Sequence, residues 1–409
     1  MKILLINSYH YRKGGADAVY FNTANLLRQN GHEVYFYSTV SDQNLPANEE
    51  SYFAPYLDFR KMQFKEKLSN WKSFIYNRQA HDQLLDFLET VKPDVAHIHL
   101  FLGSLSSSIL QALKRMKIPI VHSVHDYRLI CPAYLFLDGR NHVCERCKDD
   151  KFYNCVIHRC SGKSYAQSTI LALDAYYRKY YLNPVEYIDK FIFVSQFICN
   201  KHTLYDVEMS DKSEILYNYC PDIGTLVPES RKGDYFLYFG RLSREKGIAT
   251  LVKAAAKANV KLKIAGTGPW KKTIASKKYP DIEFLGYKSG DELWSLIRNA
   301  SFVVIPSQWY ENNPLTLIES YACGKPVIGA RIGGIPEIVI EGKTGFLFKP
   351  GSSSQLSGLL KRCQEMSTEE YQMMHENATA FGIRNFNPED YYKRLLWIYE
   401  SLVKKDRYA

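Results

Sequence analysis

Two glutamates, Glu311 and Glu319, stand eight residues apart in a run that follows the apolar stretch 302–305. Eight residues make about 2.2 turns of an α-helix, so both carboxylates could face the same side. A carboxylate on a helix at Glu319 could accept hydrogen bonds from a diol such as that of a ribose. The alternative is that Glu311 lies in a surface loop and Glu319 on a solvated helix face.

Pro314 lies between the two glutamates and suits the first turn of a helix. A helix that begins there leaves the N–H groups of Asn313, Leu315 and Thr316 without partners inside the helix. Such amides, together with the helix dipole, favour an anion such as a phosphate. The run therefore predicts a phosphate contact beside a diol contact.

Two cations stand about 65 residues upstream, Arg241 and Lys246, after the apolar stretch 235–239. Gly240 permits a sharp backbone turn before them. A guanidinium fork and an ammonium point charge suit two adjacent phosphates. The alternative is that both are ordinary surface cations.

Glycine pairs recur after other apolar stretches of the sequence. Gly266 and Gly268 follow 262–265, and Gly333–Gly334 follow 326–329. Gly14 and Gly15 lie between the first apolar stretch and a helical pattern, where backbone N–H groups can form an anion-binding concavity. We expect Gly15 and Gly268 to contact the ligand, although such glycines can also serve only as tight turns or flexible linkers.

His125 and Asp126 end another apolar stretch, 119–124. An imidazole at that point could donate a hydrogen bond to a hydroxyl or to a departing oxygen. His125 is thus a candidate catalytic residue, and a structural histidine is the alternative.

A cysteine cluster carries different chemistry. Cys144 and Cys147 form a C-x-x-C pair, and Cys155 and Cys160 follow with His158 between them. Four thiolates could hold a structural zinc ion in a tetrahedral site. The second pair is spaced more widely than in usual zinc ribbons, so reduced thiols are the alternative.

Short apolar strands alternate with helical patterns through the whole chain, which is typical of parallel sheets covered on both faces. In the first half the expected strands are 2–7, 33–38, 95–99 and 119–124. After the aperiodic stretch 220–234, six more are expected at 235–239, 262–265, 282–285, 302–305, 326–329 and 345–348.

The chain therefore has the length and pattern of two Rossmann-like α/β domains. We expect the first at 1–218 and the second at 219–386, with a helix at about 387–409 that packs back on the first. Ligands of such sheets bind outside the carboxyl ends of the strands, so two facing domains predict a cleft between them.

Composition excludes several classes of protein. The apolar fraction of 46% and the charged fraction of 23% are ordinary for a globular protein, and a net charge of +10 favours anionic partners. No nucleic-acid-binding motif is found, so nucleic acid is not an expected partner. The first apolar run is too short for a signal peptide and none approaches ~20 residues, so we expect a cytoplasmic protein with reduced cysteines.

Residues 52–81 interleave aromatic and basic side chains. This pattern predicts an amphipathic segment that binds an anionic membrane surface at the inner face of the membrane. A helix packed on its own domain is the alternative.

Taken together, these motifs resemble the retaining glycosyltransferases of family 4, which have the GT-B fold. The resemblance covers most of the chain and rests on the glutamate pair, the cationic loop, the glycine loops and His125. It implies that Arg241 and Lys246 bind the donor diphosphate, Glu319 the ribose and Glu311 the transferred sugar, with His125 near the reaction centre. Many relatives have Pro-Phe-Gly after the first glutamate, whereas this chain has Asn312-Asn313-Pro314, so Asn312 and Asn313 bear on donor identity.

The expected function is transfer of a sugar from a nucleotide diphosphate donor, UDP- or GDP-linked, to a saccharide or lipid-linked saccharide acceptor in cell-surface polysaccharide or glycolipid assembly. No Asp-x-Asp motif occurs in the sequence, so no metal cofactor is expected for catalysis. The alternatives are a sugar-nucleotide epimerase and a non-catalytic nucleotide-sugar binding protein. An NAD-dependent oxidoreductase is disfavoured, because no Gly-x-Gly-x-x-Gly follows the first strand.

Overall fold

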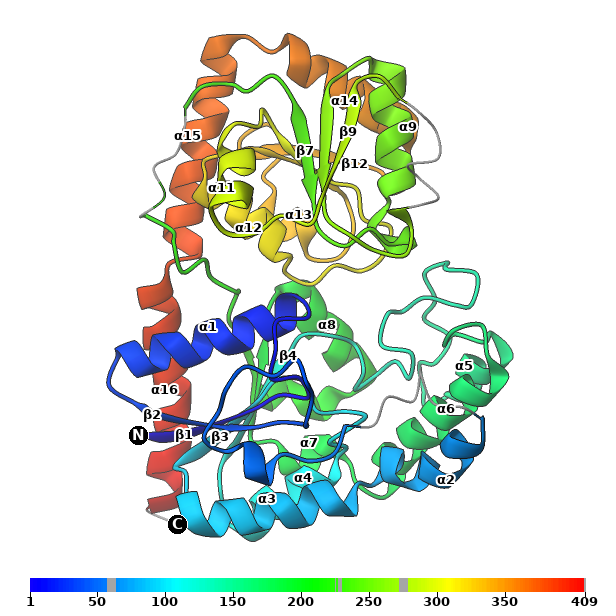
Figure 1. Cartoon of the computed structure of the whole chain (residues 1–409), viewed down its shortest axis with the longest axis vertical. Helices are drawn as coiled ribbons and strands as arrows, with labels where there is room; N and C mark the ends of the chain where they lie inside the picture. The colour runs from blue at the N-terminus through cyan, green and yellow to red at the C-terminus, as the bar shows by residue number, and fades with distance from the viewer. Residues whose placement is uncertain (57–63, 225, 227–229, 272–278, 408–409) are drawn as a thin grey trace. The chain divides into compact units, whose positions relative to one another are not determined.

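The computed structural model describes residues 1–56, 64–224, 226, 230–271 and 279–407 (Figure 1). The chain divides into two compact units. Unit 1 comprises Met1–Leu216 together with Tyr392–Ala409, and unit 2 comprises Tyr217–Tyr391. The chain passes from unit 1 to unit 2 two residues before the expected boundary at 218.

Unit 1 contains a six-stranded parallel sheet with the strand order β2-β1-β3-β4-β5-β6. The strands are β1 (Lys2–Ile6), β2 (Glu33–Tyr37), β3 (Val95–Ile98), β4 (Ile120–Val124), β5 (Lys190–Phe193) and β6 (Ser213–Ile215). The first four were predicted from the sequence, and β5 and β6 were not. The order reverses direction between β1 and β3, and ligands of open α/β sheets bind at such a switch point.

Helices of unit 1 cover both faces of this sheet. They are α1 (Gly15–Gln29), α2 (Phe64–Ile75), α3 (Arg78–Val91), α4 (Ser108–Arg115), α5 (Tyr153–Ile157), α6 (Tyr165–Tyr180), α7 (Pro184–Tyr187) and α8 (Gln196–Tyr205), with 3-10 turns η1 (Glu50–Tyr52) and η2 (Val207–Lys212). Figure 1 shows α1 on one side of the sheet and α3 and α4 on the other. The chain moves in one direction along the sheet from β1 to β2 and in the opposite direction from β2 onward. Because the crossovers between parallel strands are right-handed, helices before and after β2 lie on opposite faces.

The helix α16 (Pro388–Arg407) returns the chain to unit 1. The hydroxyl of Tyr399 lies 2.6 Å from Nδ1 of His97 on β3, and both side chains are fully buried. Arg394 also forms an ion pair with Glu214 on β6. Residues far apart in the sequence therefore complete the core of one unit.

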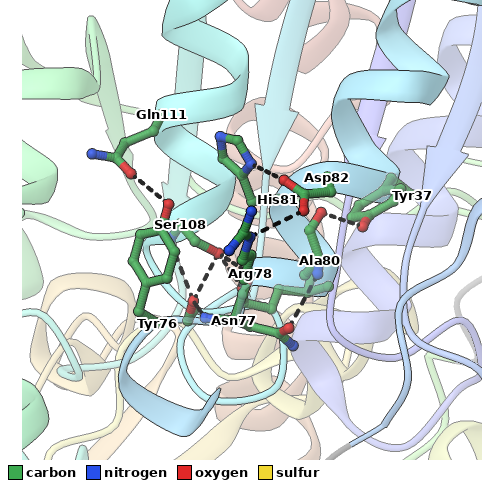
Figure 2. A network of polar contacts seen from close by, with 11 residues as sticks. Tyr37, Tyr76, Asn77, Arg78, Ala80, His81, Asp82, Ser108 and Gln111 are labelled. Atoms are coloured by element: carbon green, nitrogen blue, oxygen red, sulfur yellow. Dashed lines mark hydrogen bonds and ion pairs between the residues drawn. The ribbon is translucent and has the colours of Figure 1, made fainter. Parts of the chain in front are cut away.

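Figure 2 shows how unit 1 holds the junction between α2 and α3. Oδ1 of Asn77 accepts a hydrogen bond from the amide of Ala80 at 3.1 Å and so caps α3. Two residues of α4 reach this junction: Ser108 donates to the carbonyl of Asn77 at 2.7 Å, and Gln111 accepts from the hydroxyl of Tyr76 at 2.9 Å.

The same junction bears on the predicted membrane segment 52–81. Phe74 and Ile75, at the carboxyl end of α2 within this segment, are buried, and the guanidinium of Arg128 lies over the ring of Phe74. These side chains pack within unit 1, as the alternative interpretation expected. Residues 57–63 of the segment lie outside the described part of the chain.

Unit 2 contains a second six-stranded parallel sheet with the order β12-β11-β10-β7-β8-β9. Its strands are β7 (Phe236–Phe239), β8 (Leu262–Ala265), β9 (Ile282–Gly286), β10 (Val303–Ile305), β11 (Val327–Ala330) and β12 (Gly345–Phe348). All six follow the predicted strands within one residue at each end. The switch point lies between β7 and β10.

Two cores cover the faces of this sheet. Phe236 and Tyr238 of β7 pack with α9 and α14, whereas Leu237 and Phe239 pack with α12 and α13. The helices of unit 2 are α9 (Ile248–Ala258), α11 (Gly290–Arg298), α12 (Leu315–Ala322), α13 (Ile335–Ile338), α14 (Ser353–Glu365) and α15 (Thr368–Asn385), with a 3-10 turn η3 (Arg244–Lys246). Burial on both faces explains why the strands are continuous apolar runs.

Candidate active site

Two loops meet at the switch point of unit 2, one after β7 and one after β10. The amide of Gln308 donates to the carbonyl of Glu245 at 2.8 Å. Gly247 has φ +71°, and a Cβ at this position would lie 1.8 Å from the carbonyl oxygen of Pro306. Only glycine permits this approach. Gly247 therefore lets the loop after β7 (240–247, the cationic loop) pack directly against the loop after β10 (306–314, the glutamate loop).

Glu311 is buried where these loops meet. Its Oε1 atom accepts three hydrogen bonds, from Nζ of Lys246 at 2.7 Å, Oγ of Ser307 at 2.5 Å and Nε1 of Trp309 at 2.8 Å. All three are made to one carboxylate oxygen, so the second oxygen, Oε2, accepts none of them. The ammonium of Lys246 also lies 5.2 Å from the centroid of the Trp309 ring.

This environment keeps Glu311 ionised. Burial acts to raise the pKa of Glu311, but the neighbouring ammonium of Lys246 and the three hydrogen bonds outweigh burial and lower it below the ordinary value. The result is a fixed carboxylate with one oxygen held by the protein. Such a group can accept a hydroxyl hydrogen bond or stabilise positive charge at a nearby carbon.

The loop after β11 holds the backbone of Glu311. The amide of Gly334 donates to the carbonyl of Glu311 at 2.7 Å. Gly333 has φ +63°, and a Cβ there would lie 2.1 Å from the same carbonyl oxygen. The predicted glycine loop 333–334 therefore supports the glutamate.

Glu319 lies on α12, as the spacing predicted, one turn beyond the amides of Leu315 and Thr316. Pro314 precedes the helix in an extended conformation and makes no side-chain cap there. The first amides of α12 thus have no partner within the helix. Burial raises the pKa of the Glu319 carboxyl to about 7, with a smaller contribution from Asp222.

Asn313, whose backbone N–H was predicted to contact phosphate, is held through its side chain and its carbonyl. Its Oδ1 accepts from the amide of Asn218 at 2.8 Å, and its carbonyl accepts from Nδ2 of Asn218 at 3.1 Å. Asn312 and Asn313 are both buried. The side chain of Asn313 therefore fixes the entry to α12 within unit 2.

Arg241 is exposed and forms an ion pair with Glu245 at 2.7 Å. The glycine loop after β8 supports its backbone: the amide of Leu242 donates to the carbonyl of Thr267 at 2.8 Å, and a Cβ at Gly268 would lie 2.3 Å from the carbonyl oxygen of Leu242. Gly268 thus contacts the cationic loop, and both loops follow neighbouring strands.

His125 and Gly15 belong to unit 1. Nε2 of His125 lies 2.9 Å from Nδ1 of His99, which follows β3. Asp126 accepts from the amide of Arg128 at 2.8 Å, a contact within its own turn. Gly15 begins α1, and Asp17 two residues later accepts from Nδ2 of Asn7 at 2.9 Å, which ties α1 to the end of β1.

The predicted zinc ligands lie in unit 1. Cys155 and Cys160 lie close enough to interact, and their interaction raises the pKa of Cys155 and lowers that of Cys160. The thiol of Cys131, which lies outside the predicted zinc ligands, lies near this pair. Within the described ranges no group of three or more His, Cys, Asp or Glu side chains is arranged to hold a metal ion. All nine cysteines lie in the described ranges, and none of them forms a disulfide bond.

Several contacts at these sites were not predicted from the sequence: Ser307 and Trp309 on Glu311, Asp222 beside Glu319, Asn218 on Asn313, and His99 on His125. Ser307 and Trp309 lie within four residues of Glu311. Side-chain donors so close in sequence to a candidate carboxylate could have been predicted to bond it. His99 ends a predicted strand, and its position next to His125 follows from the pairing of β3 with β4.

Two Rossmann-like units, each built on a six-stranded parallel sheet, are the architecture of the GT-B fold. Residues 13–219 match the family model described as Glycosyltransferase Family 4, and residues 227–381 match the model of glycosyl transferases group 1. The chain therefore belongs to Glycosyltransferase Family 4. This identifies it as a glycosyltransferase and not as a sugar-nucleotide epimerase.

Known proteins similar to this chain agree with that class. An uncharacterized 42.6 kDa protein in the cps region of Klebsiella pneumoniae is 25% identical, over 83% of this chain and 87% of that protein. Lipopolysaccharide 1,2-N-acetylglucosaminetransferase of Salmonella typhimurium is 29% identical, over 39% of this chain and 46% of its own length. HepE of Anabaena, solved in complex with UDP, has a TM-score of 0.65 and 17% identity over 98% of this chain and all of that one.

In the described part of the chain, no helix has both the length and the apolar character needed to cross a membrane.

Proposed function

We propose that the chain is a retaining, metal-independent transferase that moves a sugar from a UDP- or GDP-sugar to a saccharide or lipid-linked saccharide in cell-surface polysaccharide or glycolipid assembly. The observation that carries the proposal is the pairing of Lys246 with Glu311 at the switch point of unit 2. Shortly after Glu311 in the sequence comes α12, which carries Glu319 and whose first amides have no partner within the helix.

Each group has a distinct role in this proposal. Arg241, Lys246 and the amides of Leu315 and Thr316 bind the diphosphate, because cations and helix N-termini stabilise phosphate charge. Glu319 accepts hydrogen bonds from the ribose hydroxyls. Glu311 faces the transferred sugar with Oε2 and stabilises the positive charge that develops at the anomeric carbon as the diphosphate departs.

Lys246 links binding to chemistry. Its ammonium is paired with Glu311 at 2.7 Å. A departing phosphate oxygen that also contacts Nζ of Lys246 would be stabilised by the same ammonium that pairs with Glu311. Lys246 would then stabilise the negative charge on the leaving group, and Glu311 would stabilise the positive charge on the sugar.

Metal independence rests on these fixed cations, which supply the positive charge that a divalent ion provides in other transferases. Activity should therefore survive excess EDTA. Loss of turnover on chelation, with the fold intact by circular dichroism, would contradict this part of the proposal.

The donor is proposed from the chemistry of the site and from the UDP bound by the similar structure of HepE. A saccharide acceptor is proposed because a relative transfers N-acetylglucosamine to lipopolysaccharide, according to its name. A thermal-shift panel of UDP-, GDP- and ADP-sugars identifies the base, since a ligand that binds only the folded state raises Tm.

The decisive experiment measures nucleoside diphosphate released from the stabilising donor in the presence and absence of candidate acceptors. Release that depends on an acceptor supports transfer. Tight donor binding without release under any acceptor would instead favour a non-catalytic binding protein.

We also propose association with an anionic membrane surface, which the sequence predicted for residues 52–81, and we extend the proposal to a second surface of unit 1. The described residues that support it are exposed apolar side chains of α5 and the start of α6, Ile157 and Tyr165, with exposed Arg159 and Lys163 between them. The guanidinium of Arg159 lies 5.3 Å from the ring centroid of Tyr165. Aromatic and basic side chains together suit a lipid headgroup region.

A further inference from the structure

His99 and His125 form an imidazole pair at the carboxyl ends of β3 and β4. Nδ1 of His99 lies 2.9 Å from Nε2 of His125, and the rings are stacked with centroids 5.1 Å apart and planes 13° apart. His99 is fully buried, whereas His125 is partly exposed. The pair thus has an inner member and an outer member.

Both imidazoles are neutral at physiological pH. Burial, together with a smaller contribution from nearby His122, lowers the pKa of His125 to about 3. Burial also lowers the pKa of His99 well below its ordinary value, with contributions from His97, His125 and His122. Two neutral rings share one hydrogen-bond proton, so one nitrogen donates and the other accepts.

The surroundings of His99 decide which nitrogen donates. Its second nitrogen, Nε2, is buried and has no hydrogen-bond partner among the described residues. A proton on Nε2 would leave a buried N–H group unpaired, and such orphaned N–H groups are rarer in proteins than acceptors that lack a partner. His99 therefore carries its proton on Nδ1 and donates it to Nε2 of His125.

The ring of His97 packs against the ring of His99. Its ring centroid lies 4.5 Å from that of His99, and its two nitrogens contact the hydroxyls of Tyr399 and Ser123 at 2.6 and 2.8 Å. His99 consequently has little freedom to turn its ring.

We propose that His99 is a positioning residue that holds His125 in the neutral tautomer with its proton on Nδ1. In this form His125 donates a hydrogen bond to a hydroxyl or departing oxygen and does not act as an acid or base. The catalytic consequence rests on the proposed function, whereas the tautomer is a property of the protein alone.

The test is nitrogen NMR of the full chain labelled with ¹⁵N-histidine, in which the shifts of the two ring nitrogens report the tautomer. The His125 signals are assigned by comparison with His125→Asn. We expect a protonated Nδ1 and a bare Nε2 on His125 that do not titrate between about pH 6 and about pH 8. A proton on Nε2, or signals averaged between tautomers, overturns the proposal.

Three variants test the dependence on His99. His99→Phe keeps a ring but removes the donor, so His125 should lose its fixed tautomer, and kcat should fall roughly 10-fold or more with little change in donor KM. His99→Asn places an amide N–H near the position of Nδ1, so it should keep both the fixed tautomer of His125 and the wild-type kcat. His122→Phe removes another buried histidine of the same sheet, one that bonds the carbonyl of Ile98, and should leave the tautomer unchanged.

The outcomes separate this proposal from the proposed function. If the wild-type chain shows the fixed tautomer but no transferase activity, the function fails and the positioning role stands. If His99→Phe keeps both the tautomer and full kcat, the positioning role fails. Should His99→Phe not fold, the wild-type spectrum and His99→Asn still decide.

Discussion

Glu311 and Glu319 differ in their surroundings, although both are carboxylates of the same sequence motif. Glu311 is held through Oε1 by Lys246, Ser307 and Trp309, and its pKa is lowered. Glu319 has no such partner set, and burial raises its pKa to about 7. These different environments agree with the different roles proposed for them, Glu311 in catalysis and Glu319 in ligand binding.

The first prediction separates those roles by kinetics. Glu319→Ala should raise donor KM about 10-fold to 150-fold, because a charged hydrogen bond contributes roughly 1.5 to 3 kcal/mol. Glu311→Gln should lower kcat and leave the affinity for nucleoside diphosphate nearly unchanged, because its interaction strengthens in the transition state. Calorimetry with the diphosphate checks the affinities. Loss of affinity in Glu311→Gln as severe as in Arg241→Ala would contradict the assignment.

The second prediction concerns Trp309. Trp309→Phe keeps an aromatic ring beside Lys246 but removes the N–H donor to Glu311. A lost hydrogen bond to the charged form raises the pKa of Glu311, so the acid limb of the kcat profile should move to higher pH. Trp294→Phe, on α11, is the matched control and should leave the profile unchanged. An unchanged acid limb in Trp309→Phe would show that the indole does not tune this carboxylate.

The third prediction follows from Glu319. Ribose hydroxyls donate best to an ionised carboxylate, and with a pKa of about 7 the ionised fraction falls as pH decreases. Affinity for the nucleoside diphosphate should therefore drop by up to about 10-fold between about pH 8 and about pH 6. The phosphate itself titrates in this range, so Glu319→Gln provides the baseline. A pH dependence equal in both proteins would refute the role of Glu319.

At the residue scale, the sequence predicted which residues are candidates for the site and on which elements they lie. The residues that contact them are seen only in the structure. The spacing of Glu311 and Glu319 predicted a carboxylate on a helix, and Glu319 lies on α12. It did not predict that Ser307 and Trp309 fold back onto Glu311, because local spacing does not determine the path of an irregular loop. The pairing of His99 with His125 depends on strand adjacency, which no single segment encodes.

At the scale of elements, four loops at the carboxyl ends of β7, β8, β10 and β11 form the site of unit 2. They are joined by backbone contacts at glycines, such as that of Gly333 with the carbonyl of Glu311. Strand positions were predictable because fully buried parallel strands are short apolar runs. The strands β5 and β6 escaped prediction, and β6 has only three residues, none fully buried.

The fourth prediction tests the loop contact. Gly333→Ala places a Cβ 2.1 Å from the carbonyl oxygen of Glu311 at a φ of +63°, so the loop must move. We expect a loss of about 1 to 3 kcal/mol of stability together with a fall in kcat. Gly342→Ala is the control, since Gly342 has φ +72° but its Cβ would meet nothing within 4 Å. Equal effects of both changes on kcat would show that backbone strain alone accounts for the result.

Zinc at Cys144, Cys147, Cys155 and Cys160 stays a prediction from the sequence. Elemental analysis of the purified chain, with a matched sample of Cys144→Ser, tests it directly. Less than about 0.1 zinc per chain would rule it out, and stoichiometric zinc lost in Cys144→Ser would support it.

At the scale of the whole molecule, the fifth prediction concerns membrane surfaces. The chain should float with vesicles that contain anionic lipid, and binding should weaken with salt. The double change Ile157→Ser and Tyr165→Ser should reduce flotation, whereas Tyr287→Ser with Met373→Ser, two exposed residues of unit 2, should not. Equal flotation with neutral and anionic vesicles would remove the lipid-surface proposal.

The return of α16 to unit 1 has a consequence for synthesis on the ribosome. Tyr399 completes the core around His97, yet the whole of Tyr217–Tyr391 is translated between β6 and the part of α16 that contains Tyr399. The nascent first unit must therefore remain incomplete while the second unit emerges and can already fold. A premature stop codon anywhere in the second unit would leave both halves of the enzyme unfinished, so truncated products should be cleared by proteases and should not persist as half-active fragments.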